Sequence, residues 1–195
     1  MLAIVGLGNP GEKYAHTRHN AGWDVLEILS QKLNAPIKRL KCQATIGDAM
    51  IGSEKVLLVH PQTFMNLSGS AVQEMMAFYK LAPEQVLVAV DDIDLPFGQV
   101  RVRAKGGPGT HNGMRSIVQC TGTDAFPRIR IGMGAPPPEW DLADWVLGGF
   151  NTPEDRKIAF DAYMLASDAA LCWAENGINL AMNRFNKKPV TDTAK

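Results

Sequence analysis

Short apolar runs punctuate the chain and end at polar or glycine residues. Leu2–Val5, Lys55–His60 and Val86–Val90 each hold four or more apolar residues in succession, which is typical of buried strands. Alternation in Gln99–Arg103 predicts a further strand with one wet, basic face, and Ile129–Met133 predicts another. Five strands are therefore expected from these patterns.

Between these runs, apolar residues recur at helical spacing. Helices are predicted over Trp23–Leu33, Ser70–Tyr79 and Asn112–Cys120. A rigid triple-proline loop at 136–138 and a short aromatic segment follow the last strand. Thr152, Pro153 and Glu154 then supply an N-cap, an N1 proline and an acidic first-turn residue, so the longest helix is expected to begin there.

Strands and helices alternate throughout, which predicts one α/β domain over residues 1–185. Its sheet should be mostly parallel, with helices on both faces. Residues 186–195 are polar and are expected to form a frayed tail.

Composition narrows the class of protein. The chain has 195 residues, of which 46% are hydrophobic and 21% charged, as in soluble globular domains. Three widely spaced cysteines, with no CxxC pair, argue against a disulfide framework or a thiolate zinc site and favour a reducing cytoplasm. No apolar stretch reaches the roughly 18 residues that a membrane span needs. We therefore expect a soluble cytoplasmic protein.

The first candidate motif is Gly6-x-Gly8-x-x-Gly11, which follows a strand as a dinucleotide fingerprint does. In that fingerprint a helix begins at once, whereas here Pro10 and a polar stretch intervene, and the acidic residue expected further on is missing. A tight strand-to-loop turn is the favoured interpretation. It leaves Asn9 at the tip, where its side chain can face a substrate.

A second polar cluster, Thr17–Asn20, lies just before the first predicted helix. In one interpretation Asn20 caps that helix and His19 is an exposed loop residue. In the other, His19 is a general base, because histidine titrates near neutrality. His16 and His19 are three residues apart without a third ligand nearby, so no metal site is predicted.

Asp91, Asp92 and Asp94 follow a predicted buried strand, and α/β proteins build their sites at such strand ends. A carboxylate there can orient a histidine, the cluster can hold magnesium, or the turn can simply be solvated. Spacing leaves these three readings open. In Thr63–Gly69, similarly, Asn66 or Ser68 can cap a helix, while Met65 can line an apolar pocket.

Charge is balanced over the whole chain but not locally. Lysines plus arginines and aspartates plus glutamates both number 20, so the formal net charge is zero. Residues 96–135, however, carry six basic residues against the single acid Asp124, a local charge of +5. The glycine-rich loop before Asn112 adds a helix N-terminus that can hold an anion. A polyanion-binding patch is predicted, with a solvated strand face as the alternative. A second basic cluster over 32–41 can extend it.

Taken together these segments resemble bacterial peptidyl-tRNA hydrolase, from Ile4 to about Arg184. The motifs that carry the resemblance are Val5-Gly6-Leu7-Gly8-Asn9-Pro10-Gly11, Tyr14-x-x-Thr17-Arg18-His19-Asn20-x-Gly22, Thr63-Phe64-Met65-Asn66-Leu67-Ser68-Gly69, Asp91-x-x-Asp94-Leu95-Pro96 and His111-Asn112-Gly113. The resemblance implies a monomeric cytoplasmic α/β enzyme with a twisted, mixed sheet. It further implies hydrolysis of the ester between a peptide and the 3′-terminal ribose of tRNA, with no metal, organic cofactor or obligatory protein partner.

The resemblance also implies roles for individual residues. His19 is similar to the catalytic base and Asp91 to its orienting partner. The positions similar to substrate-binding residues are Asn9, Tyr14, Met65, Asn66 and Asn112. The positions similar to tRNA phosphate-binding residues are Arg101, Arg103, Lys105 and Arg130. Two departures, Pro108 and Thr110 in the glycine-rich loop and Val90 before the aspartate, affect loop mobility and packing.

Two other classes of function remain as alternatives. A nucleotide-dependent oxidoreductase, based on the glycine motif, predicts that NAD raises the melting temperature. A non-catalytic RNA-binding protein, based on the basic patch, predicts that tRNA binds without turnover.

Overall fold

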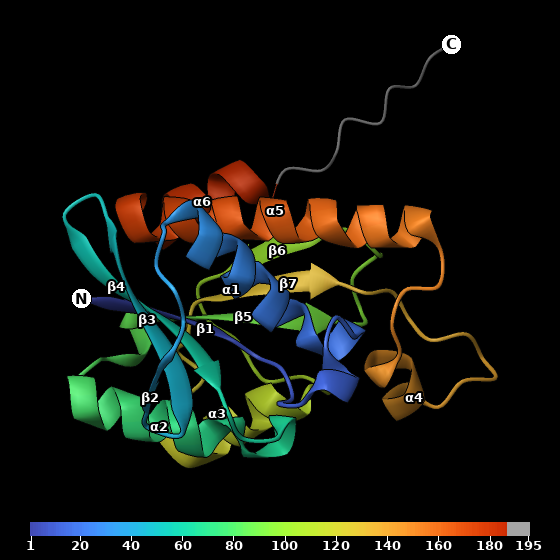
Figure 1. Ribbon diagram of the computed structural model, residues 1–195, viewed down its shortest axis with the longest axis horizontal. Coiled ribbons are helices and arrows are strands. Elements are labelled where there is room, and N and C mark those ends of the chain that lie inside the picture. Colours follow the sequence, from blue (N-terminus) through green and yellow to red (C-terminus); the bar gives the residue numbers. More distant parts are fainter. Residues whose placement is uncertain (187–195) are drawn as a thin grey trace, which may run out of the picture.

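A twisted seven-stranded mixed sheet runs through the centre of the molecule (Figure 1). The computed structural model describes residues 1–186, and the predicted tail from 187 onward lies outside the described residues. The strands are β1 (Leu2–Gly6), β2 (Arg39–Lys41), β3 (Ala44–Ile51), β4 (Glu54–Pro61), β5 (Val86–Asp92), β6 (Val100–Arg103) and β7 (Arg128–Gly132). Their order is β2-β3-β4-β1-β5-β7-β6. The central four are mutually parallel, while the pairs at both edges are antiparallel.

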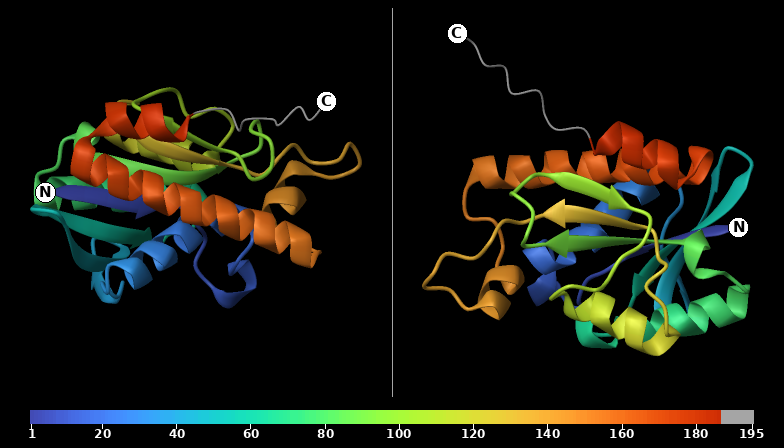
Figure 2. Two further views of the ribbon diagram at one scale, coloured as in Figure 1. Left: turned by 90° about the horizontal axis from the view of Figure 1, so that it is seen from above. Right: turned by 180° about the vertical axis from the view of Figure 1, so that it is seen from behind.

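Helices cover both faces of this sheet, as predicted. The helices are α1 (Ala21–Lys32), α2 (Ser68–Tyr79), α3 (Asn112–Thr121), α4 (Leu142–Leu147), α5 (Pro153–Asn176) and α6 (Ile178–Phe185). The first, fifth and sixth pack on one face and the second and third on the other, each over its own buried apolar cluster. Figure 2 shows α4 apart from both layers, beyond the carboxyl ends of β5 and β7.

The predicted elements are present with small shifts at their ends, and the structure adds four. Strands β2 and β3 form an antiparallel extension that the periodicity did not predict. Helix α4 occupies the aromatic segment, and α6 follows α5 after a break at Gly177, whose φ is 82°. Thr152 caps α5 by accepting a hydrogen bond from the Asp155 amide at 3.0 Å, as expected.

Asn186, the first residue of the predicted tail, lies within the described part of the chain. Asn186 was expected to be frayed, but its side chain pairs with the edge strand β6. The Oδ1 atom accepts from the Val102 amide at 2.8 Å and Nδ2 donates to the Val102 carbonyl at 2.9 Å. The Asn186 side chain thus satisfies one backbone residue of β6 much as another strand would.

Gly6 of the first motif and Gly22 at the start of α1 allow close packing. A Cβ atom on Gly6 would lie 2.2 Å from the carbonyl oxygen of Gly22, and a Cβ on Gly22 would lie 2.4 Å from that of Ala89. Helix α1 therefore approaches β1 and β5 at backbone contact distance. It begins only at Ala21, after two short 3-10 turns at Glu12–Tyr14 and Arg18–Asn20, and not directly after the glycines.

Candidate active site

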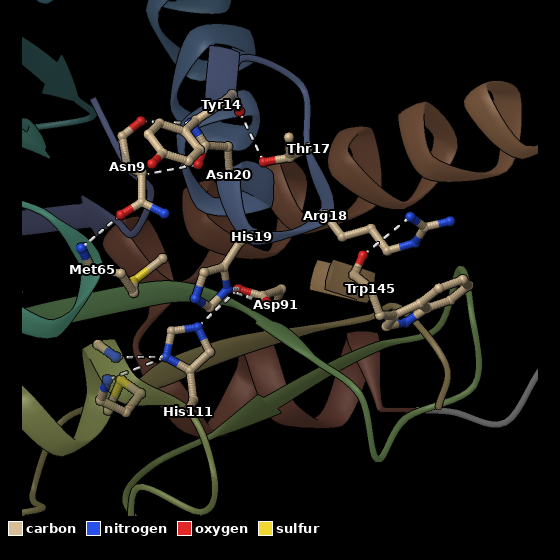
Figure 3. A network of polar contacts seen from close by, with 12 residues as sticks. Asn9, Tyr14, Thr17, Arg18, His19, Asn20, Met65, Asp91, His111 and Trp145 are labelled. Atoms are coloured by element: carbon tan, nitrogen blue, oxygen red, sulfur yellow. Dashed lines mark hydrogen bonds and ion pairs between the residues drawn. The ribbon is translucent and has the colours of Figure 1, made fainter. Parts of the chain in front are cut away.

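A buried carboxylate between two histidines lies at the end of β5 (Figure 3). Asp91 accepts from Nδ1 of His19 at 2.9 and 3.0 Å and from Nε2 of His111 at 2.8 Å. The side chains of His19, Asp91 and His111 are only 10%, 2% and 11% exposed. The interpretation of His19 as an exposed loop residue is therefore wrong.

Each histidine lies just before the first residue of a helix. His19 lies in the 3-10 turn Arg18–Asn20, immediately before α1. His111 is the N-cap of α3, and its Nδ1 accepts hydrogen bonds from the amides of Gly113 and Met114 at 3.1 and 3.3 Å. Because that nitrogen is an acceptor, the neutral ring carries its proton on Nε2, which donates to Asp91.

His111 is a site residue that sequence reasoning missed. It was noted only as part of a motif, and no role was predicted for its side chain. A histidine before a predicted helix signals an N-cap, but His111 is 20 positions along the chain from Asp91, which conceals their contact.

The two imidazoles determine the charge of Asp91. Complete burial acts to raise the pKa of Asp91, but His111 and His19 more than offset this through charge and hydrogen bonds, and its pKa lies well below the ordinary range. The carboxylate is therefore ionised at neutral pH and accepts from both rings.

These three residues are also the one group among residues 1–186 with the spacing of a metal site. Their ligand atoms lie within 4.8 Å of one another. A divalent cation at about 2.0–2.2 Å from each atom would replace the hydrogen bonds that now join them. Hydrogen bonding alone accounts for the observed arrangement.

Asp91 is distinct from the two other acids of its motif. Asp92 pairs with Arg130 and accepts the Asp94 amide at 2.9 Å, while Asp94 itself is exposed. Only Asp91 faces the histidines, so the geometry favours the first of the three interpretations of this cluster.

Two asparagines bind each other beside the histidine. Asn20 accepts the Asn9 amide at 2.9 Å through Oδ1 and donates to the Asn9 carbonyl at 3.0 Å through Nδ2. The idea that the Asn20 side chain caps α1 is wrong, because both ends of its amide are used to hold the loop at Asn9. In turn, Oδ1 of Asn9 accepts the Met65 amide at 2.8 Å.

Capping of α2 is a further correction. Its N-cap is Leu67, with no side-chain cap, and neither Asn66 nor Ser68 caps it. The Ser68 hydroxyl instead donates to the Met65 carbonyl at 2.8 Å.

A cavity of about 850 Å³ opens over these groups. The predicted site residues that line it are Asn9, His19, Met65, Asn66, Asp91, Asn112, Arg103, Lys105 and Arg130. Tyr14 and Arg101 lie outside its lining. Tyr14 packs edge-on against Phe64, which does line the cavity, with ring centroids 6.4 Å apart. Arg101 is paired in register with Arg130 on the adjacent strand.

One arginine on the basic side of the cavity, Arg128, has a structural contact instead of a free charge. Arg128 is buried and donates to the carbonyls of Gly107 and Asp124 at 3.0 Å and of Phe126 at 3.3 Å. It therefore anchors the glycine-rich loop. Arg103 and Lys105 belong to no ion pair among the described residues.

The fold and this site define the class of protein: a single-domain α/β enzyme with a histidine–carboxylate pair in a cavity that has a basic wall. The family model described as peptidyl-tRNA hydrolase matches residues 3–193. The chain belongs to the peptidyl-tRNA hydrolase family, which confirms the resemblance seen in the sequence.

Individual relatives agree over nearly the whole length. The peptidyl-tRNA hydrolase of Alkaliphilus metalliredigens is 49% identical, over 95% of this chain and 100% of that protein. The one from Agathobacter rectalis is 50% identical with the same coverage. A crystal structure of peptidyl-tRNA hydrolase from Acinetobacter baumannii aligns with a TM-score of 0.89 at 37% identity, covering 95% of this chain and 94% of that one. Within residues 1–186, no helix is long and apolar enough to cross a membrane.

Proposed function

We propose that the protein hydrolyses the ester bond of peptidyl-tRNA, releasing free tRNA and an N-blocked amino acid or peptide, with His19 as the base that activates water. The observation that carries this mechanism is the contact between His19 and an ionised, buried Asp91 at the edge of the cavity. Since the carboxylate accepts the proton on Nδ1, the lone pair of the neutral ring is on Nε2, the nitrogen that a base uses.

The reaction then proceeds by ordinary ester chemistry. Nε2 of His19 takes a proton from water as the water oxygen attacks the ester carbonyl carbon. The negative charge of Asp91 stabilises the imidazolium that results. When the tetrahedral intermediate collapses, the bond to the ribose oxygen breaks, and the proton on His19 passes to that oxygen. His111 supports this step as a positioning residue, because its Nε2–H group holds the carboxylate from the other side.

Carboxamides supply the polar contacts to the ester. Asn9, Asn66 and Asn112 come from three separate segments and line one cavity. The Met65 amide fixes Oδ1 of Asn9, which directs its NH₂ group away from that contact and makes it available to an oxyanion. Met65 offers an apolar surface to the peptide, and Tyr14 acts through Phe64, on which its ring packs.

The basic wall binds the tRNA. Arg103, Lys105 and Arg130 line the cavity, and Arg101 lies beside Arg130 on the edge strand. A tRNA whose acceptor end enters the cavity meets these cations with its phosphates. We propose further that residues 1–186 form one catalytic unit that acts as a monomer in the cytoplasm, without a metal, an organic cofactor or an obligatory protein partner.

The deciding experiment follows ester cleavage of N-acetylated aminoacyl-tRNA by the wild-type protein and by two variants with the same substitution. His19→Asn should lower kcat by roughly 10²–10⁴-fold, the range for loss of a general base. His16→Asn is the matched control, since His16 is exposed and its φ of 58° suits asparagine. Binding of tRNA without cleavage by the wild-type protein would instead support the non-catalytic alternative. Comparable cleavage by His19→Asn and wild type would exclude His19 as the base.

A further inference from the structure

The side chain of Arg18, the residue before the proposed base, forms hydrogen bonds at the carboxyl end of helix α4. Its Nη1 atom donates to the carbonyls of Trp145, Gly148 and Gly149 at 3.3, 3.1 and 2.8 Å. The Arg18 backbone amide also donates to the Gly148 carbonyl at 3.1 Å. Arg18 is only 7% exposed, although nothing in its sequence context required burial of a cation.

Aromatic rings complete this contact. The guanidinium carbon lies 3.7 Å from the centroid of the Trp145 ring and 5.0 Å from that of Phe150. Cation–π attraction is strongest where water is excluded, as it is here. Figure 3 shows the Arg18 side chain extending away from His19 toward Trp145.

Helix α4 depends on such a contact. It has six residues, and an isolated helix of that length is not stable in water. Its carboxyl end also lacks a left-handed glycine cap, because Gly148 is extended, with φ −82° and ψ 150°. The carbonyls that a helix leaves unpaired at this end carry partial negative charge. Of the carbonyls that Arg18 contacts, that of Trp145 lies in α4 and also accepts the Gly148 amide at 3.2 Å, while those of Gly148 and Gly149 directly follow the helix. Arg18 therefore adds hydrogen bonds and a positive charge at this negatively polarised end.

The same helix forms a wall of the cavity. Leu142, Val146 and Leu147 line it from α4, whereas Phe64 and Met65 line it from the segment before α2. Among residues 1–186, α4 has one other polar side-chain hydrogen bond to the rest of the protein, from Nε1 of Trp145 to the Gly134 carbonyl at 3.1 Å. Arg18 therefore supplies most of the polar side-chain contacts that hold this apolar wall.

We propose that Arg18 is a positioning residue that docks α4 against the turn carrying His19. One three-residue turn then fixes both the imidazole and the apolar wall across the cavity. The structural part of this proposal stands by itself. Its consequence for substrate binding rests on the proposed function, because only a substrate that enters the cavity meets the wall.

Amide hydrogen exchange tests the structural part without any substrate. In Arg18→Gln, exchange over 143–149 should become at least about tenfold faster, while the amides of β5 keep their wild-type rates. Arg18→Lys keeps the positive charge but loses the planar guanidinium. Its exchange rates in α4 should lie between those of the wild type and of Arg18→Gln. Arg156→Gln is the matched control, since Arg156 donates to the Phe150 carbonyl at 3.0 Å and, within residues 1–186, its side chain has no hydrogen bond to α4. Wild-type exchange in α4 of Arg18→Gln, or a uniform rise across the chain, would overturn the proposal.

Kinetics with a short N-acylated aminoacyl nucleotide tests the functional part. Loss of the wall should raise KM by about tenfold while kcat changes less than about threefold, since the lost contact is not to the reacting atoms. A fall in kcat at constant KM would place the effect on His19 alone and would overturn the role in substrate binding. Failure of the wild-type protein to cleave the substrate would refute the proposed function but leave the exchange result intact.

A second variant tests whether the effect of Arg18→Gln comes from the lost contact or from a local change at residue 18. Trp145→Leu removes the ring beneath the guanidinium from the α4 side, far from the His19 turn in sequence. The effects of Arg18→Gln and Trp145→Leu on exchange in α4 should be strongly non-additive, because the two residues act through one contact. Additive effects would show that they hold α4 independently and would refute the docking contact.

Discussion

Acid stability should depend strongly on one histidine outside the active site. His60 on β4 is 4% exposed and stacks on Trp23, with ring centroids 4.9 Å apart and an angle of 12° between the planes. Its Nε2 is buried and has no hydrogen-bond partner among the described residues, and Glu27 is 3.8 Å from its Nδ1. Burial lowers the pKa of His60 from its ordinary 6.5 to about 4, against a smaller opposing effect of a backbone hydrogen bond at Trp23.

The sign of the effect follows from proton linkage. Between pH 6.5 and 4 the unfolded chain binds a proton at this residue and the folded chain does not, so the free energy of unfolding falls as the pH falls through this window. A shift from 6.5 to about 4 corresponds to about 3 kcal/mol in total, at about 1.4 kcal/mol per unit. Above pH 6.5 His60 is neutral in both states, so its titration no longer lowers the free energy of unfolding.

Urea unfolding at a series of pH values between 7 and 4.5 measures this contribution. His60→Gln and His60→Leu both abolish the titration but differ in polarity and shape, so their stabilities at pH 7 need not agree. The difference between wild type and each variant should nevertheless shift by roughly 2–3 kcal/mol over the series, with the variants losing less stability in acid. Curves that stay parallel to the wild-type curve would refute the reasoning, because they would show that His60 titrates alike in both states.

Three further predictions concern the site and the packing around it. Asp91→Asn should lower kcat by about 10²-fold or more, because the imidazole of the base loses its anionic partner; Asp94→Asn, which changes an exposed acid of the same motif, should cleave N-acetylated aminoacyl-tRNA at a near wild-type rate. Arg103→Gln should weaken binding of full-length tRNA and reduce the slope of log K against log salt by about 0.7–0.9, yet leave hydrolysis of a short acylated nucleotide nearly unchanged. Gly69→Ala should lower the free energy of unfolding by about 1–3 kcal/mol, because its Cβ would lie 2.1 Å from the Ser116 carbonyl oxygen. Gly149→Ala is the control in the same denaturation assay, because a Cβ at Gly149 would meet open space.

The sequence predicted the central part of the fold well. Buried parallel strands such as Val86–Val90 are nearly continuous apolar runs, and amphipathic helices repeat at a period that few other structures share. The extension formed by β2 and β3 has neither signal. All three residues of β2 are exposed, and β3 has Gly47 at a buried position, so its alternation is broken. Six residues of α4 are likewise too few to show a period.

At the site, residue type identified the individual groups but not their contacts. Residue type left the roles of the histidine and of the three acids open, and the resemblance implied that His19 and Asp91 are a base and its partner. The structure brings these two side chains together. The bonds between Asn9 and Asn20, and between His111 and Asp91, join residues on different loops. No local pattern encodes such pairs, because they depend on how the strand ends converge in the folded chain.

If the basic wall binds tRNA as proposed, charge pairing within it should limit how many phosphates it holds. Arg130 was grouped with Arg103 and Lys105 from its position in the sequence, but its guanidinium is already paired with Asp92 beside the cavity. A phosphate that approached Arg130 would also meet that carboxylate, so the pair contributes little net attraction. Arg103 and Lys105 have no such neighbour among the ion pairs of the described residues. Counterion release at the cavity should therefore come mainly from Arg103 and Lys105, with a smaller share from Arg130, whose charge Asp92 partly offsets.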